Sequence, residues 1–233
     1  MMKQHIPIII FILLSNIVFA QECNYYLPLE ENRGLIIENY DRRDRLQGKQ
    51  DLMVKEVHHH SDYIEARILA KHFDTRDRLQ HEMEFSVQCR GGELILDIQS
   101  IIDQSMLAGF QGMEINMTTT DIMIPDNPEV GDQLPDANLQ MTVSSAGIQI
   151  SEMALNIQNR LVEAQETITT PAGSYECFKI TYDTYTELKA MGIPKKMMSK
   201  GVEYLAPGLG TIRTEMYNDK GRLESYSVLS EIY

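Results

Sequence analysis

The chain has 233 residues, with 21 lysines and arginines against 34 aspartates and glutamates, giving a net charge of −13 at pH 7. It is long enough to bury a full hydrophobic core, and contents of 43% apolar and 24% charged residues exclude wholesale disorder, collagen and a coiled coil. The acidic balance, with no block of basic residues apparent, argues against a nucleic-acid partner.

The first twenty residues have the parts of a secretory signal peptide. Lys3 supplies a positive start, residues 6–18 are almost all apolar, and Val18 and Ala20 place small residues before a cleavage site. This apolar stretch is shorter than the roughly 20 residues of a spanning helix, and no later stretch is apolar enough. We therefore predict a signal peptide at 1–20, a single all-β domain at 21–233, export, and no transmembrane segment in the mature chain.

Three cysteines follow the signal peptide, and export would allow a disulfide to persist. Cys177 lies in a strand-like run, where a free buried thiol behaves as a small hydrophobe. We therefore favour a bridge between Cys23 and Cys89, although spacing alone leaves the other pairings open. Cys23 does not directly follow a small-residue lipobox, so no lipid anchor is expected on it.

A seven-residue pattern occurs three times, at 40–46, 73–79 and 217–223. Each copy has an aromatic residue, Asp or Asn, any residue, a basic residue, Asp or Gly, Arg and Leu. Asp or Asn at the second position can accept backbone hydrogen bonds, and Asp or Gly at the fifth tolerates a positive φ. The pattern predicts three β-hairpin turns.

Between these turns, short apolar and β-branched runs are separated by polar or glycine-containing breaks, which is typical of strands. The expected strands lie at 52–57, 63–70, 82–89, 93–98, 204–207, 210–217 and 223–232.

Two longer runs alternate apolar with other residues, as expected when one face of a sheet is buried. The alternating residues are Met153, Leu155 and Ile157 in the first run and Phe178, Ile180 and Tyr182 in the second. The apolar phase changes after Arg160, which predicts a bulge or bend, and residues 170–174 predict a turn between the two runs.

Helix-like spacing occurs only at 100–110, and prolines at 121–135 predict a surface loop. The expected fold is mainly β: one strongly curved antiparallel sheet, a half-barrel, with at most one or two short helices. A sheet of this many strands must curl or close.

His58 and His60 are weak candidates for a metal site, since alternate strand residues share a side and Glu56 or Asp62 lies close in sequence. The alternative is a polar hairpin tip, which we favour. No nucleophile motif or phosphate-binding loop is present, so the sequence predicts neither an enzyme nor a bound cofactor.

Methionine is abundant, with 14 residues, and tryptophan is absent. Methionine fills irregular gaps in a core, and it also suits a cavity for a flexible apolar ligand such as an acyl chain. Both interpretations remain open from the sequence.

Several motifs together resemble the TapB-type family, exported bacterial proteins of unknown function. They are Cys23-x-x-Tyr26-x-Pro28, Cys89-x-Gly91-Gly92, Val130-Gly131-x-x-Leu134-Pro135-Asp136-Ala137, Thr169-Thr170-Pro171-Ala172-Gly173-x-Tyr175-x-Cys177-x-Lys179-Ile180 and Glu203-Tyr204-x-Ala206-Pro207-Gly208-x-Gly210. The family resembles, more distantly, the half-barrel of the lipoprotein carriers LolA and LolB. This resemblance implies an apolar cavity and a location in the periplasm or cell envelope of a gram-negative bacterium.

Two functions follow as hypotheses. The first is a non-enzymatic envelope protein that binds an apolar ligand, a lipid or a lipidated partner in the concavity. The residues expected on the concave face are Met153, Leu155, Ile157, Phe178, Ile180 and Tyr182. The second is a structural or protein-interaction module of the envelope that has no small-molecule ligand.

Overall fold

The computed structural model describes residues 30–98, 110, 112–190 and 193–233. The predicted signal peptide, Cys23 and nearly all of the predicted helix at 100–110 lie outside these residues. The described strands are β1 (Gly34–Asp41), β2 (Leu46–His59), β3 (Tyr63–Phe73), β4 (Leu79–Arg90), β5 (Glu93–Leu96), β6 (Glu114–Thr120), β7 (Ile122–Pro125), β8 (Ala137–Ser145), β9 (Ile148–Thr170), β10 (Gly173–Ala190), β11 (Ile193–Ala206), β12 (Gly210–Asn218) and β13 (Leu223–Ile232).

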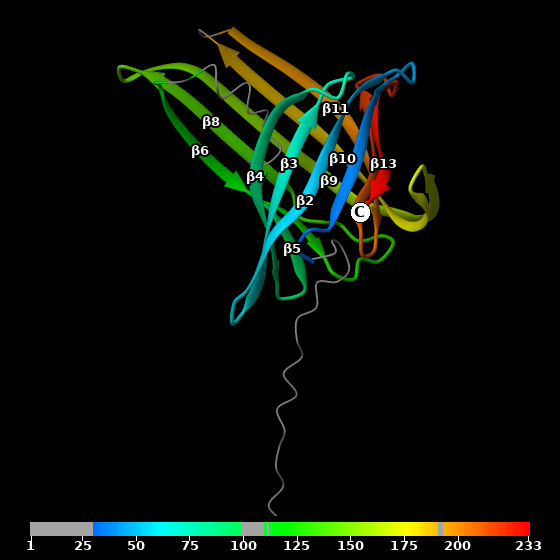
Figure 1. The fold of residues 1–233 in the computed structure, drawn as a ribbon. Helices are drawn as coiled ribbons and strands as arrows, with labels where there is room; N and C mark the ends of the chain where they lie inside the picture. The colour runs from blue at the N-terminus through cyan, green and yellow to red at the C-terminus, as the bar shows by residue number, and fades with distance from the viewer. Residues whose placement is uncertain (1–29, 99–109, 111, 191–192) are drawn as a thin grey trace, which may run out of the picture.

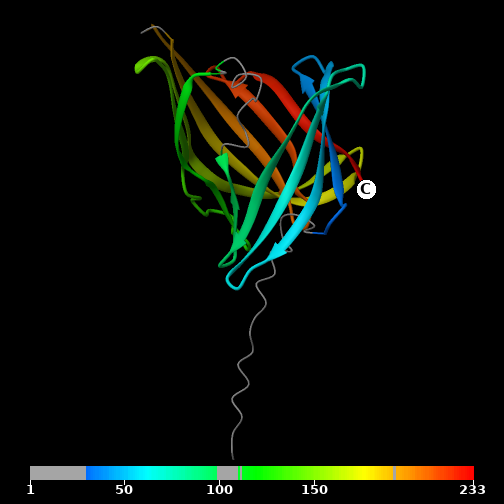
Figure 2. The same ribbon diagram turned by 60° about the vertical axis from the view of Figure 1, so that its left-hand side comes forward.

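All thirteen strands belong to one sheet, in the order β6-β8-β9-β10-β11-β12-β13-β1-β2-β3-β4-β5-β7, and every neighbouring pair is antiparallel. The two edge strands, β6 and β7, are consecutive in the chain and are separated only by Asp121. The sheet therefore curls until its edges approach each other (Figures 1 and 2). The predicted curved antiparallel sheet is confirmed, and it is a nearly closed barrel.

The three predicted hairpin turns are confirmed. In the first, Asp41 Oδ1 accepts the backbone N–H groups of Arg43 at 2.8 Å and Arg45 at 3.0 Å, and Asp44 has a φ of 57°. The turn after β3 repeats this geometry around Asp74, and the turn after β12 repeats it around Asn218 with glycine at the positive-φ position. These turns thus fix where three pairs of strands reverse.

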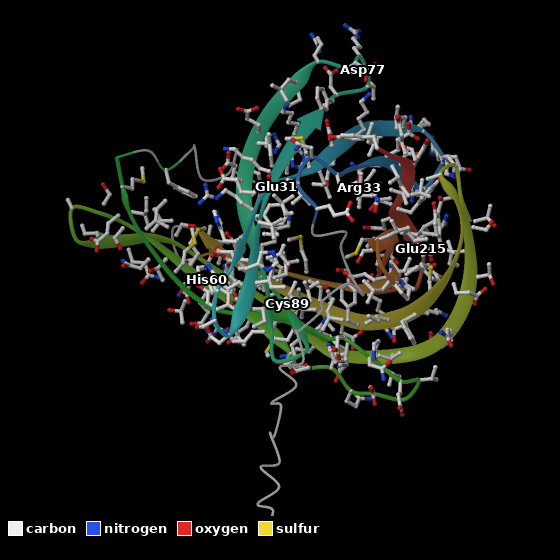
Figure 3. The ribbon with its side chains drawn as sticks, turned by 60° about the horizontal axis from the view of Figure 1, so that its bottom comes forward. Glu31, Arg33, His60, Asp77, Cys89 and Glu215 are labelled. Carbon is white, nitrogen blue, oxygen red and sulfur yellow. The ribbon has the colours of Figure 1, made fainter. Side chains whose placement is uncertain are left out.

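Antiparallel order places five hairpin connections at one end of the barrel, because alternate strands of such a sheet run in the same direction. This end, called the turn end, carries the β1–β2, β3–β4, β8–β9, β10–β11 and β12–β13 connections and lies at the top of Figure 1. The opposite end is called the core end. Figure 3 shows Asp77 of the β3–β4 turn far from His60 and Cys89, which lie at the core end.

The main hydrophobic core fills the core end. It joins buried residues of β2–β5 and β7 to buried residues of β9–β11, strands that lie on facing walls of the barrel. Ala66 and Val87 on one wall and Val162, Ile180 and Leu205 on the other are at most 2% exposed. Contact between facing walls means that side chains close the barrel at this end.

The β9–β10 hairpin is the longest of the fold, and β9 contains the bulge that the sequence predicted. Register with β10 shifts around Thr181 and Asp183, and Asn159 has a φ of 54°. The end of the hairpin reaches β13 (yellow in Figure 1), and the predicted 170–174 turn closes it. Cys177 packs there with Leu229 in a separate cluster, on the sheet face opposite Phe178.

One prediction about a connection is wrong in part. The segment 121–135, expected to be a loop, begins with strand β7, which pairs with β5 from Glu93↔Pro125 to Leu96↔Ile122. Proline is tolerated at Pro125 because that residue ends an edge strand.

Candidate functional site

The inner face of β8 and β9, together with Tyr182 and Leu188 of β10, forms an apolar wall. Met153 and Ile157 of β9 are buried beside Leu139 and Met141 of β8, and Leu155 packs partly buried against them. On β10, Tyr182 also packs against this second cluster, whereas the other two predicted residues, Phe178 and Ile180, belong to the core-end cluster. The six predicted residues therefore lie on the inner side of the sheet but divide between two levels of the barrel.

The two levels differ in how completely they are filled. Phe178 and Ile180 are 6% and 0% exposed. Toward the turn end, inward-facing Leu155, Tyr182 and Leu188 stay partly exposed although they pack on the same wall. Beside them, Met141, Val143 and Met153 of β8 and β9 are buried, so the wall is only partly exposed toward the turn end.

Arg160 marks the boundary between these levels. The bulge at Asn159 turns its side chain inward, and it is only 2% exposed. Its Nη1 donates hydrogen bonds to the carbonyl oxygens of Met123 at 3.0 Å and Pro135 at 2.7 Å. Burial lowers the pKa of the guanidinium, and the nearby charge of Glu203 opposes that shift. A buried guanidinium needs such partners, because an unpaired buried charge is costly.

Tyr182 and Glu203 complete a polar cluster with Arg160 on the inner face. The Tyr182 ring covers Gly201, where a Cβ atom would overlap it, and the hydroxyl lies 3.9 Å from Met216 Sδ. Burial raises the pKa of the Glu203 carboxyl, while Arg160 and a hydrogen bond from Tyr182 oppose the shift. Burial and Glu203 also raise the pKa of Tyr182.

This cluster supplies a donor-rich guanidinium, a hydroxyl and a carboxylate directly beneath an apolar wall. Such a set can orient the polar end of an amphipathic molecule by hydrogen bonds while its apolar part contacts the wall. Sequence reasoning identified the bulge at Arg160 but missed the cluster. The available signal was an arginine interrupting an otherwise apolar alternation, directly after Asn159.

The prediction for one cysteine, Cys177, can be compared with the structure. Cys177 is free and buried, as predicted, and burial raises the pKa of its thiol to about 11. Cys89 lies in β4 and is 1% exposed. Because Cys23 lies outside the described residues, its bridge to Cys89 stays a prediction.

The two histidines considered for a metal have other neighbours. His58 Nε2 lies 3.3 Å from Glu56 Oε2, and the His60 ring stacks on Tyr63 with centroids 4.2 Å apart. Within the described ranges, no group of three or more ligating side chains gathers to hold a metal ion. The interpretation as a hairpin tip fits the observed turn between β2 and β3.

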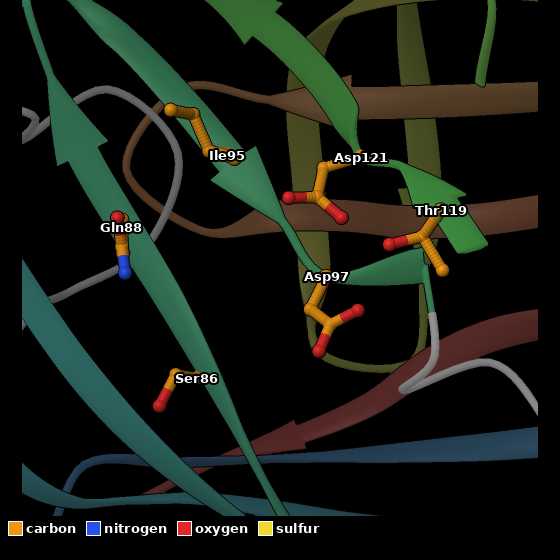
Figure 4. A pocket seen from close by; sticks show the side chains of 6 residues that line it. All are labelled: Ser86, Gln88, Ile95, Asp97, Thr119 and Asp121. Carbon is orange, nitrogen blue, oxygen red and sulfur yellow. The ribbon is translucent and has the colours of Figure 1, made fainter. Parts of the chain in front are cut away.

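A pocket of about 220 Å³ lies where the sheet edges approach each other (Figure 4). Its lining residues are Ser86, Gln88, Ile95, Asp97, Thr119 and Asp121. Ser86 and Gln88 alternate with the inward-facing Val87 and Cys89, so the pocket opens on the outer face of the barrel. It is small and mostly polar, and it is separate from the inner wall.

The methionines lie both in the core and on the surface, and the buried ones fit the first interpretation, gap filling in a core. Met141 and Met153 are buried in the inner wall, whereas Met197 and Met198 of β11 are 42% and 63% exposed.

In the part of the chain that the structure describes, no helix has the length and apolar character needed to cross a membrane.

Two solved structures share this fold. A Bacteroides fragilis protein, described as exported with a YmcC-like fold, is 19% identical with a TM-score of 0.71, covering 90% of this chain and 99% of its own. A Parabacteroides distasonis protein, described as a lipoprotein, is 22% identical with a TM-score of 0.73, covering 91% of this chain and 100% of its own. Among curated proteins, none matches this sequence.

A family model covers most of the chain, from residue 30 to residue 229. The matched region contains every described strand except the last residues of β13. The protein therefore belongs to the DUF3108-like family.

Proposed function

We propose that this protein is a non-enzymatic, exported envelope protein of a gram-negative bacterium. In this proposal it binds an apolar ligand, or the lipid of a lipidated partner, inside the half of the barrel nearer the turn end. The fold neighbours described as an exported protein and a lipoprotein are consistent with that location.

One observation carries the proposal. Leu155, Leu188 and Tyr182 face inward on the apolar wall yet remain partly exposed. Their neighbours Met141, Val143 and Met153 are buried, as are Phe178 and Ile180 at the core end. An inner apolar surface left accessible to water is costly unless something covers it during function. An acyl chain is the simplest ligand that matches an elongated apolar wall.

The polar cluster would set the orientation of the ligand. Arg160 and Tyr182 can donate hydrogen bonds to a carboxylate, phosphate or ester at the base of the wall, and Glu203 can accept one. The apolar chain would then extend along Leu155 and Leu188 toward the turn end. The expected ligand is therefore amphipathic.

A fluorescence titration with cis-parinaric acid tests this proposal. Binding at micromolar concentration is expected. Leu155→Trp, which fills the wall, should weaken it at least tenfold. Gln140→Trp, on the outer, exposed face of β8, should leave it unchanged. Equal binding by both variants, or none by the wild type, would reject an internal ligand site and favour a protein-interaction module.

Two narrower assignments accompany the proposal. A Cys23–Cys89 bridge would tie the start of the mature chain to β4, and peptide mapping under non-reducing conditions tests it. Recovery of Cys177 in a disulfide would contradict the pairing. The assignment of this protein to the TapB-type family also stays a prediction.

A further inference from the structure

Two histidines face each other beside the second repeated turn, near the turn end of the barrel. His72 of β3 is the register partner of His81 of β4. Their rings stack, with centroids 4.1 Å apart and planes 15° from parallel, and both residues are partly buried. The β3–β4 hairpin therefore holds two imidazoles next to each other.

The other two repeated turns have different residues at this place. Beside the first turn the register partners are Asn39 and Gly48, and beside the third they are Met216 and Ser225. All three turns are stabilised in the same way, by an Asp or Asn side chain that accepts two backbone N–H groups. The turn geometry therefore does not require the histidine pair.

Both rings project into the barrel. Alternate residues of a strand share a face, and Ala66 and Ile68 of β3 and Val87 of β4 belong to the main hydrophobic core. His72 lies on the side of Ala66 and Ile68, and His81 lies on the side of Val87, because no register shift occurs between these positions. The pair is therefore part of the inner wall.

A thioether lies on the same face. Met83 is two residues after His81 on β4, so the two side chains share a side, and the register partner of Met83 is the small residue Ala70. His72 is thus the diagonal neighbour of Met83, at a spacing of about 7–8 Å that a long side chain can span. This patch of the inner wall combines two imidazoles with one thioether.

The charged side chains of this part of the hairpin point outward. Lys71 and Glu82 are register partners that alternate with the two histidines, so they lie on the outer face. On β2, the register partner of His72 is the uncharged Gln50. Among the described residues, no group of three histidine, cysteine, aspartate or glutamate side chains could hold a metal ion, so no carboxylate or thiolate joins the pair. The patch is a neutral set of possible metal ligands.

We propose that His72, His81 and Met83 form a binding site for Cu(I). Imidazole suits copper and zinc alike, but a thioether selects the soft Cu(I) ion. Zinc sites use three or four protein ligands from Cys, His, Asp and Glu, and this patch supplies two. The inference goes beyond ligand binding in the barrel and does not depend on it.

The pair needs only a small rearrangement to hold an ion. The 4.1 Å between the ring centroids is about twice a metal–nitrogen bond of roughly 2 Å, so an ion fits between the two imidazoles. Nearly parallel rings do not both aim a lone pair at one point, so the rings must turn about χ2, which is a broad torsion for histidine. The stacking of the rings is therefore expected to be lost when the ion binds.

Anaerobic titration of the mature protein with Cu(I), in competition with bathocuproine disulfonate, tests the proposal. The wild type is expected to bind one Cu(I) ion, and more tightly than Zn²⁺. His81→Asn removes a ligand and should weaken Cu(I) binding at least about tenfold, since even residues that only support a metal ligand typically contribute that much. Met83→Leu nearly conserves volume and should weaken Cu(I) binding but not Zn²⁺ binding, whereas Met198→Leu on β11 should change neither.

Further variants separate this patch from other ligands of the chain. The double variant His58→Asn, His60→Asn and the variant Cys177→Ala should each bind Cu(I) as the wild type does. X-ray absorption should show a sulfur neighbour of copper in the wild type and none in Met83→Leu. No Cu(I) uptake by the wild type, unchanged affinity in His81→Asn, loss of uptake in Cys177→Ala or tighter binding of Zn²⁺ would each overturn the proposal. None of these outcomes bears on the cis-parinaric acid titration.

Discussion

The two ends of this barrel use the same sheet for different purposes. At the core end, side chains from facing walls meet and leave residues such as Ile180 and Leu205 almost without exposure. At the turn end, the same strands keep their hydrogen bonding while inner residues such as Leu155 and Leu188 stay partly exposed. A filled end that stabilises the fold allows the other end to carry an accessible apolar surface.

The largest expected difference between the ends is in stability. Ile180→Ala removes a fully buried side chain and should lower the free energy of unfolding by about 2–5 kcal/mol. Leu155→Ala removes a partly exposed side chain and should cost about 1 kcal/mol. Urea denaturation of both variants measures this, and equal losses would mean that the two ends are packed alike.

The boundary between the ends depends on Arg160. Arg160→Met would leave the carbonyl groups of Met123 and Pro135 without their donor and should cost about 1–3 kcal/mol. Arg160→Lys keeps the charge and a single donor nitrogen in place of the guanidinium fork, so it should recover part of that loss. If Arg160→Met is as stable as the wild type in urea, the cluster is not a structural boundary.

Glu203 should make stability depend on pH. Its folded-state pKa is raised by burial, so its contribution is most favourable at low pH and is lost as pH rises through the folded pKa. Glu203→Gln does not titrate and should show a flatter profile of unfolding free energy between pH 4 and 8. Parallel profiles for the two proteins would contradict the buried position of this carboxyl.

The repeated turns should give the smallest effect. Hydrogen bonds from Arg45 and Arg78 lower the pKa values of Asp41 and Asp74 to about 2, so their contribution is present above the unfolded pKa and lost as pH falls toward 2. Asp41→Asn and Asp74→Asn should keep the turns at neutral pH, as Asn218 does, and reduce the acid sensitivity of the melting temperature. A large loss at pH 7 would contradict this account of the turns.

Local patterns predicted much of the fold. Alternation in 153–158 and 178–182 predicted strands with one inward face, the phase change after Arg160 predicted the bulge, and three aspartate or asparagine turns predicted hairpins. These features depend on hydrogen bonds and side-chain direction within a few residues, so the sequence contains them directly.

Features that depend on distant contacts were not predictable in the same way. Arg160 finds its acceptors 37 and 25 residues away, at Met123 and Pro135. The turns after β1, β3 and β12 lie beside the β10–β11 hairpin only because of the order of the strands in the sheet.

The most direct test is mass spectrometry of organic extracts of the protein purified from its native envelope. The account predicts a reproducible, near-stoichiometric amphipathic molecule with an acyl chain in the wild type and in Gln140→Trp, and its loss in Leu155→Trp. Reproducible absence of any such molecule from the wild type, together with an experimental structure whose interior is filled up to the turn end, would contradict it.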